Sequence, residues 1–325
     1  MSEVKHLPVD PSEDGVRLDR WFKRRFPHIK HGQLEKMLRK GEIRVDSGRV
    51  KSNTRLEAGQ EVRVPPLPAP EETPDQPGVP ARDAKLIRSL ILYEDETMIA
   101  LNKPSGLAVQ GGSKTTRHID GMLPALERNG ETPRLVHRLD RDTSGVLIVA
   151  KTTQEAARLA KLFKGRDLQK IYWAIALGAP RPREGVIKGH VRKAAGMGDN
   201  PDREQMVFAE HGDEGARYSL TDYAVVAEAG RRASWVALKP MTGRTHQLRV
   251  HMAAAGHAIL GDGKYVCDIP TPEGLDKRLH LHARSLTLPT ARGGTIEITA
   301  PLPDHMANTF NTFGFDPAAY MDPFA

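Results

Sequence analysis

The proline-rich stretch PPLPAPEETPDQPGVP, residues 65–80, limits the fold of this chain more than any other feature. Proline has no backbone N–H to donate and its ring fixes φ, so this stretch cannot be a helix or a central strand. We interpret residues 65–84 as a semi-rigid linker, although a structured arm lying across the rest of the chain would have the same composition. The sequence therefore predicts a small folded part at residues 14–64 and a large one at residues 85–310, followed by a C-terminal tail at residues 311–325.

The small part has the pattern of two helices followed by a hairpin. In VRLDRWFKRRFP the apolar side chains recur at helical spacing, and GQLEKMLRKG has the same spacing and ends at Gly41. EIRVDSGRVK reads as a strand, a turn and a return strand, and GQEVRVP supplies one more strand. About 50 residues of this pattern are enough for a minimal domain.

Positive charge is concentrated in the same segment. Residues 14–64 hold 14 lysines and arginines against 7 aspartates and glutamates, so they account for the whole net charge of +7. A basic module on a neutral body favours a polyanionic partner, most simply nucleic acid, although a solvated surface would give the same count. No apolar run approaches the roughly 18 residues that span a bilayer, and the single Cys267 allows no internal disulfide. We expect a cytoplasmic protein.

Beyond residue 85, strands and helices follow one another irregularly. LILYEDETMIALNKP reads as strand, turn and strand, GVLIVAK as a buried strand, TQEAARLAKLFKG as an amphipathic helix and THQLRVHMAAAG as a helix. KIYWAIALG alternates, which places Trp173 on one face of a strand and Tyr172 on the other. Because the order is not a regular βαβ repeat, we expect an α+β fold with a mixed, mainly antiparallel sheet. The phenylalanines of the tail would let it pack on the body or stay loose.

The densest cluster of ionisable residues is HRLDRDTSG, residues 137–145, directly before the apolar VLIVA. Gly145 allows an unusual backbone turn there, so the preceding residues would lie at the mouth of the sheet. A carboxylate held in such a place can act as a nucleophile or move a proton. Asp140 and Asp142 are both candidates, and the alternative is that both only cap the loop and form surface ion pairs.

A second cluster is GRTHQLRVH, with Arg244, His246, Arg249 and His251. On a helix, His246 and Arg249 are three positions apart and share a face. The buried face would then consist of Leu248, Met252 and Ala255. An arginine on such a helix could pair with a buried carboxylate and fix its direction, although a basic helix that touches phosphates or water is the simpler interpretation.

Three motifs, LVHRLDRDTSG, KIYWAIALG and TGRTHQLRVHM, occur in that order. Together they resemble the core motifs of the RluA family of pseudouridine synthases. LNKPSGLAVQGGS and the basic N-terminal segment place the resemblance nearest the RluC-type branch, which modifies large-subunit (23S) ribosomal RNA. The small part resembles an S4 RNA-binding domain in LDRW, KMLRKGEIRV and LEAGQEVRV, with VDSG where that family usually has Val-Asn-Gly.

The resemblance implies an isomerase that breaks the bond between uracil N1 and the ribose, turns the base over and rejoins it through C5. It implies no redox step and no cofactor. The catalytic aspartate of the family falls on Asp140, its active-site tyrosine on Tyr172 and its aspartate-pairing arginine on Arg249. Leu248 matches the apolar residue beside the target base. We also expect four side chains to bind the RNA: Arg138, Arg141, Arg244 and His246.

Other functions stay open on sequence grounds. The chain could be a non-catalytic RNA-binding or ribosome-assembly factor, or it could modify transfer RNA instead. Metal-dependent hydrolysis is disfavoured, because His280 and His282 share one face of a strand without Cys or Glu at ligand spacing. We therefore expect no metal. No coiled-coil pattern or spare apolar helix face is present, which favours a monomer.

Overall fold

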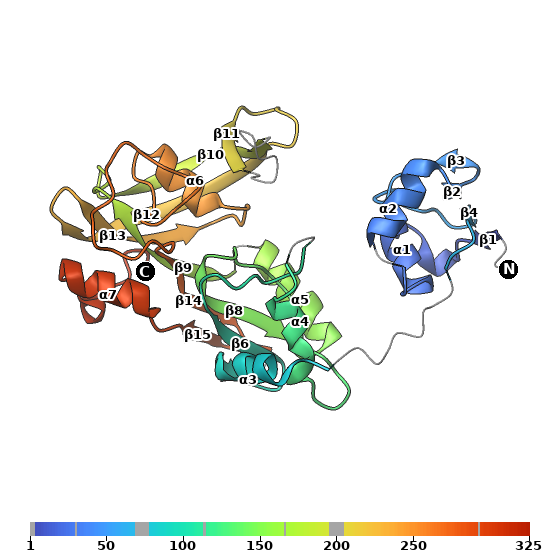
Figure 1. Cartoon of the computed structure of the whole chain (residues 1–325), viewed down its shortest axis with the longest axis horizontal. Helices are drawn as coiled ribbons and strands as arrows, with labels where there is room; N and C mark the ends of the chain where they lie inside the picture. Colours follow the sequence, from blue (N-terminus) through green and yellow to red (C-terminus); the bar gives the residue numbers. More distant parts are fainter. Residues whose placement is uncertain are drawn as a thin grey trace. The chain divides into compact units, whose positions relative to one another are not determined.

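The computed structural model describes residues 4–29, 31–68, 78–112, 115–165, 167–194, 205–291 and 293–325. The chain divides into two compact units, Met1–Pro77 and Gly78–Ala325, whose elements are labelled in Figure 1. Residues 69–77, which belong to the predicted linker, lie outside the described residues.

The small unit contains the helices and strands that the sequence predicts, and one strand more. Its elements are β1 (Lys5–Pro8), the 3-10 helix η1 (Pro11–Glu13), α1 (Leu18–Arg25), α2 (His31–Lys40), β2 (Arg44–Val45), β3 (Gly48–Arg49) and β4 (Glu61–Val64). The strand order is β1-β4-β2-β3, with Trp21, Phe22 and Leu38 buried in the core. Strand β1 pairs with β4, so the unit begins before the predicted start at residue 14. The four residues KHLP are too short, and end on a proline, to stand out as a strand in the sequence.

The large unit contains one extended sheet and its covering helices (Figure 1). Its helices are α3 (Ala81–Ser89), α4 (Ile119–Met122), η2 (Leu123–Leu126), α5 (Thr153–Lys164), α6 (Gln247–Ala254), α7 (Asp304–Phe313) and η3 (Pro317–Ala319). Its strands are β5 (Ile91–Glu94), β6 (Met98–Lys103), β7 (Arg134–Leu135), β8 (Ser144–Ala150), β9 (Gln169–Leu177), β10 (Glu184–Ala194), β11 (Gln205–Ala209), β12 (Arg217–Ala229), β13 (Ala233–Pro240), β14 (Leu281–Pro289) and β15 (Thr295–Thr299).

The main path of the sheet runs β11-β10-β12-β13-β9-β14-β8-β6-β5, with β15 beside β14 and β7 beside β8. Strands β8 and β14 are parallel, and the other neighbouring pairs are antiparallel. The α+β fold with a mixed, mainly antiparallel sheet is therefore confirmed. In the part of the chain that the structure describes, no helix has the length and apolar character needed to cross a membrane.

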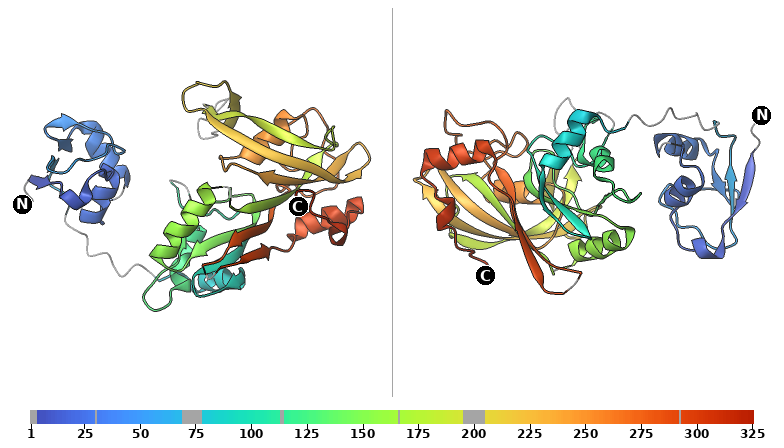
Figure 2. Two further views of the ribbon diagram at one scale, coloured as in Figure 1. Left: turned by 180° about the vertical axis from the view of Figure 1, so that it is seen from behind. Right: turned by 90° about the horizontal axis from the view of Figure 1, so that it is seen from below.

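The two faces of β9 have different neighbours, as its alternation predicts. Trp173 packs with Trp235 and Phe310 on the face covered by α7, the red helix that follows β15 in Figure 2. Tyr172 lies on the opposite face and packs in the cluster that contains Leu248 of α6. The side of the sheet that carries α6 is therefore the side on which the predicted functional residues meet.

Two predicted boundaries of the large unit also differ from the structure. Helix α3 begins at Ala81, inside the predicted linker of residues 65–84. At the other end, α7 crosses the predicted boundary at residue 310, and Phe315 of the tail is buried among the aromatic rings of the large unit. The chain after residue 310 thus packs on the large unit, because Phe315 and Tyr320 lie against Trp235.

Candidate active site

The loop that carries Asp140 ends at β8, all seven residues of which are buried. Gly145, the second residue of that strand, has φ +110°, and a Cβ there would lie 2.2 Å from the carbonyl oxygen of Ala283. Only glycine allows β8 to approach β14 so closely, in the register that pairs Gly145 with Ala283. The strand is therefore a rigid support from which the charged loop emerges.

Lys103 holds this loop in place through hydrogen bonds to backbone carbonyl groups. Its buried Nζ donates to the carbonyl oxygens of Pro104 at 3.0 Å, Leu107 at 2.7 Å and Arg141 at 2.9 Å. Burial lowers the pKa of Lys103 to about 7, against the opposing effect of the Asp142 and Asp140 carboxylates. Sequence reasoning missed this lysine, whose position at the end of an apolar strand, MIALNK, was the available signal.

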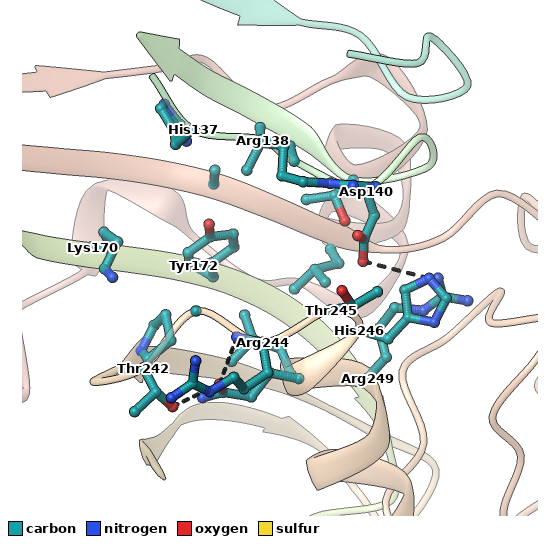
Figure 3. Close-up of a pocket in the computed structure, with 18 of the residues that line it drawn as sticks. His137, Arg138, Asp140, Lys170, Tyr172, Thr242, Arg244, Thr245, His246 and Arg249 are labelled. Carbon is teal, nitrogen blue, oxygen red and sulfur yellow. Dashed lines mark hydrogen bonds and ion pairs between the residues drawn. The ribbon is translucent and has the colours of Figure 1, made fainter. Parts of the chain in front are cut away.

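A cavity of about 280 Å³ opens beside the loop, and Figure 3 shows the side chains that surround it. Its lining includes seven of the eight predicted site residues: Arg138, Asp140, Tyr172, Arg244, His246, Leu248 and Arg249. Arg141 is not among the lining residues, and its Nε donates to the carbonyl oxygen of Gly106 at 3.1 Å. The volume is near the lower limit of about 300 Å³ for ligand pockets, which suits a single nucleoside.

Tyr172 contributes a ring and a neutral hydroxyl to the cavity. Burial, with a smaller contribution from the Asp140 carboxylate, raises the pKa of Tyr172 above its ordinary value of 10.0. The tyrosine therefore stays protonated at neutral pH. A flat, half-buried ring of this kind can stack on a base.

Helix α6 begins later than the sequence pattern predicts. Its first residue is Gln247, and His246 is the N-cap with φ 51°, in the left-handed region. His246 and Arg249 therefore do not share a helical face, so that prediction was wrong. The side chain of Gln247 fixes this turn, because its Oε1 accepts from Thr242 Oγ1 at 2.7 Å and from the Arg244 N–H at 3.1 Å.

The burial of α6 agrees only in part with the prediction. Leu248 and Met252 are buried, but Ala255 is exposed at the C-cap. Residues between these positions are also buried, and four neighbouring strands, β10 to β13, contact the helix. One of them is Arg249, which is 5% exposed.

Arg249 pairs with Asp262 and not with Asp140 as predicted. Its Nε and Nη2 donate to Asp262 Oδ2 and Oδ1 at 2.7 and 2.6 Å, and the Asp262 side chain has no exposed surface. Burial by itself lowers the pKa of Arg249, but the hydrogen bonds and charge of Asp262, and then the charge of Asp140, raise it overall. The ion-pair contact of Asp140 is with His246, whose Nε2 lies 3.9 Å from Asp140 Oδ2 (Figure 3).

Two further ionisable residues line the cavity and were not predicted as site residues. Lys170 lies on β9 two residues before Tyr172, on the same face, and burial lowers its pKa. Among the described residues no ion pair of Lys170 is found. His137 accepts a hydrogen bond from the Ile148 N–H at 2.8 Å, and burial lowers its pKa to about 3, so its ring is neutral.

The described residues contain no group of three or more His, Cys, Asp or Glu side chains placed to hold a metal ion. The two histidines predicted to share a strand face are both buried, but only His282 belongs to β14. His282 Nδ1 lies 2.9 Å from Ser144 Oγ, and His280 Nε2 lies 2.8 Å from Thr309 Oγ1. The first bond joins β14 to β8, and the second joins the residue before β14 to α7.

Residues 97–254 match the RNA pseudouridylate synthase family, and the chain belongs to that family. It is similar to ribosomal large subunit pseudouridine synthase C of Pasteurella multocida, with 35% identity over 308 residues that cover 93% of this chain and 92% of the relative. The protein of the same name from Vibrio cholerae is 33% identical over 94% of this chain and 95% of the relative.

A solved structure agrees with these relatives. Human RNA Pseudouridylate Synthase Domain Containing 4 is 30% identical and superimposes with a TM-score of 0.60 over 72% of this chain and 97% of the human chain. The large unit is therefore an RNA pseudouridine synthase domain, and the chain is an enzyme of that class.

Proposed function

We propose that this enzyme converts specific uridines of 23S large-subunit ribosomal RNA to pseudouridine, with Asp140 as the essential carboxylate. The names of the bacterial relatives support the choice of substrate. The observation that carries the catalytic assignment is the meeting of Asp140, Tyr172 and Leu248 at one cavity, from three separate segments of the chain.

The reaction needs no group from outside the nucleoside. The bond from N1 to ribose C1′ breaks, the base turns, a bond from C5 to C1′ forms, the proton on C5 leaves and N1 takes up a proton. Atoms and electrons balance without an oxidant or a donor, which supports a cofactor-free mechanism. Asp140 acts next to the sugar, either by attacking the ribose or by removing a proton. Its support on β8 and Lys103 keeps it in place for either step.

The cavity suits a uridine that has left its stack. Unstacking costs a few kcal/mol, which contacts of the base with Tyr172 and Leu248 would offset. Arg138 comes from the same loop as Asp140 and can fill the gap that the base leaves. Lys170 and Arg244 supply positive charge for the phosphates beside the target.

We infer that the small unit is an S4-like domain and that it provides most of the binding to RNA outside the cavity. The solvent-exposed faces of its two helices carry the basic residues Arg20, Lys23, Arg24, Arg25, Lys36, Arg39 and Lys40. Contacts between such residues and phosphates are largely blind to sequence and weaken as salt rises. We expect the enzyme to work as a monomer in the cytoplasm, and light scattering should give a mass near 35.9 kDa.

The test is pseudouridine mapping of ribosomal RNA from a strain that lacks the protein, complemented with the wild type or with Asp140→Asn. Sites lost in the deletion and restored only by the wild type would establish substrate and carboxylate together. Unchanged ribosomal RNA with lost sites in transfer RNA would move the substrate to transfer RNA. If Asp140→Asn restored every site, the catalytic assignment would be wrong.

A further inference from the structure

A chain of polar contacts ends at Asp140 and has no part in the scheme above. The Met206 N–H donates to the Tyr265 hydroxyl oxygen at 2.8 Å, and that oxygen lies 2.9 Å from His246 Nδ1. On the far side of the imidazole, His246 Nε2 faces Asp140 Oδ2 at 3.9 Å (Figure 3). The four groups come from four separate segments, so the arrangement depends on the complete fold.

These contacts select one tautomer of the His246 ring. The hydroxyl oxygen of Tyr265 already accepts the Met206 N–H, and among the described residues its own proton has one acceptor, His246 Nδ1. If Nδ1 accepts, the ring proton lies on Nε2 and points at the Asp140 carboxylate. The other tautomer would leave the buried hydroxyl proton without a partner and turn a nitrogen lone pair towards a carboxylate. Both features are unfavourable: a buried donor without a partner costs about 1–3 kcal/mol, and a lone pair is repelled by the negative charge of a carboxylate.

His246 has a strained backbone conformation, which indicates that the direction of its ring is enforced by the surrounding structure. Its φ of 51° is in the left-handed region, which costs a residue other than glycine of the order of 1–3 kcal/mol. The contacts of Gln247 described above hold this turn, and the strained turn directs the ring at Asp140 instead of along the helix. Strain of this kind is kept where the surrounding structure enforces it, which is common at functional sites.

The ring stays neutral in this environment. Burial lowers the pKa of His246, the nearby Asp140 carboxylate opposes that effect, and Arg249 adds to it. At 3.9 Å the contact with Asp140 is electrostatic and too long for a hydrogen bond. A movement of about 1 Å would complete one, and catalytic hydrogen bonds that are long without substrate commonly tighten in the substrate complex.

We propose that His246 is a positioning residue: fixed as the Nε2–H tautomer by the Tyr265 hydroxyl, it holds the Asp140 carboxylate in a single orientation before the target uridine. The inference rests on the proposed role of Asp140. Tyr265 is itself held by the buried ion pair, since its N–H donates to Asp262 at 3.1 Å and its ring lies 5.2 Å from the Arg249 guanidinium carbon. Arg249 thus acts on Asp140 in part through Tyr265 and His246.

Two amide substitutions separate this role from simple packing. In His246→Gln the side-chain amide reaches the position of Nε2 and offers an N–H to Asp140, whereas in His246→Asn it reaches only the position of Nδ1. Asparagine tolerates the left-handed conformation better than glutamine, so a loss in His246→Asn cannot be ascribed to the backbone. We expect single-turnover rates at saturating enzyme on a ribosomal RNA fragment to fall about 100-fold for Asn and less than 10-fold for Gln, with the enzyme concentration that gives half the maximal rate unchanged. Equal losses in the two variants would overturn the proposal.

The tautomer can be observed directly. ¹⁵N NMR of the full chain should show His246 protonated on Nε2 with Nδ1 accepting, and Tyr265→Phe should give a mixture of tautomers. A wild-type ring protonated on Nδ1 would overturn the inference. The variant Asp140→Asn, measured in the same rate assay, distinguishes a failure of the role of Asp140 from a failure of the role of His246. If Asp140→Asn is active, the role of Asp140 fails; if it is inactive while the Gln and Asn variants are alike, only the role of His246 fails.

Discussion

The buried ion pair between Arg249 and Asp262 gives the sharpest quantitative prediction. Both hydrogen bonds of this pair are short, and its side chains are 5% and 0% exposed. The chain also holds an exposed pair of the same bidentate form, Arg278 with Asp276, whose side chains are 55% and 34% exposed. The second pair is a control for exposure, because it has the same bidentate form but is in contact with water.

Removing one charge should lower the free energy of unfolding much more in the buried pair than in the exposed pair. Loss of one partner from a buried pair costs about 3–5 kcal/mol, whereas an exposed pair contributes about 1 kcal/mol at most. For Asp262→Asn we expect a value near 3 kcal/mol, because the Asp140 carboxylate still compensates part of the Arg249 charge. The large unit has about 250 residues, so its melting temperature should fall by roughly 6–12 °C. For Asp276→Asn we expect a decrease of no more than about 4 °C.

The assays are thermal and urea unfolding of the full chain followed by fluorescence, with the single variant Arg249→Met and the double variant Arg249→Met/Asp262→Asn included. The double variant removes both charges and keeps an acceptor for the N–H groups of Lys264 and Tyr265, which Asp262 now serves. We expect it to be more stable than the sum of the single variants predicts, by roughly 2 kcal/mol. If Asp262→Asn destabilised the protein no more than Asp276→Asn does, the structural role of the pair would be refuted.

Three further outcomes are expected. Lys170→Gln should lower kcat/KM and reduce the slope of log binding constant against log salt by about 1, while the exposed Lys188→Gln on β10 should leave kcat/KM unchanged. Tyr172→Phe should retain more activity than Tyr172→Ala if the ring stacks on the base, and equal losses in a single-turnover assay would shift the role to the hydroxyl. Burial lowers the pKa of His280 and His282 from 6.5 to about 4. Between pH 6.5 and pH 4 the unfolded chain therefore binds more protons than the folded chain, so acid favours unfolding. Urea unfolding should show the full free energy of unfolding above pH 6.5 and a loss of up to about 3 kcal/mol per histidine as the pH falls to 4.

Local patterns predicted the elements that face the site. The alternation in KIYWAIALG gave the two faces of β9, and the run VLIVA gave the buried strand β8. The charges before β8 placed the loop at the cavity, because a polar loop that meets a buried strand must emerge at the end of that strand, but they left Asp140 and Asp142 as equal candidates; the family resemblance chose Asp140, which lines the cavity. Hydrophobic periodicity is a local property, so a single sequence is enough to read it.

The partners of the site residues were predicted less well. Asp262 is 13 residues from Arg249 and has no motif around it, so only the complete fold brings the two together. The long strands β10 and β12 were also missed, because much of their surface is polar and their alternation is weak. Contacts that depend on a turn between elements are invisible to a rule that considers one element at a time.

His246 shows why a correct motif can suggest a wrong geometry. In GRTHQLRVH a helix that starts at Thr245 and one that starts at Gln247 have nearly the same apolar pattern, yet they direct His246 differently. What decides between them is the hydrogen bonding of Gln247 with Thr242 and with the backbone of Leu220, groups that lie 5 and 27 residues away. The left-handed turn that results directs the imidazole at Asp140 and leaves Arg249 inside the helix to pair with Asp262. Gln247 therefore determines that His246 faces Asp140 and that Arg249 pairs with Asp262. This glutamine carries no charge, so a search for catalytic groups would pass over it.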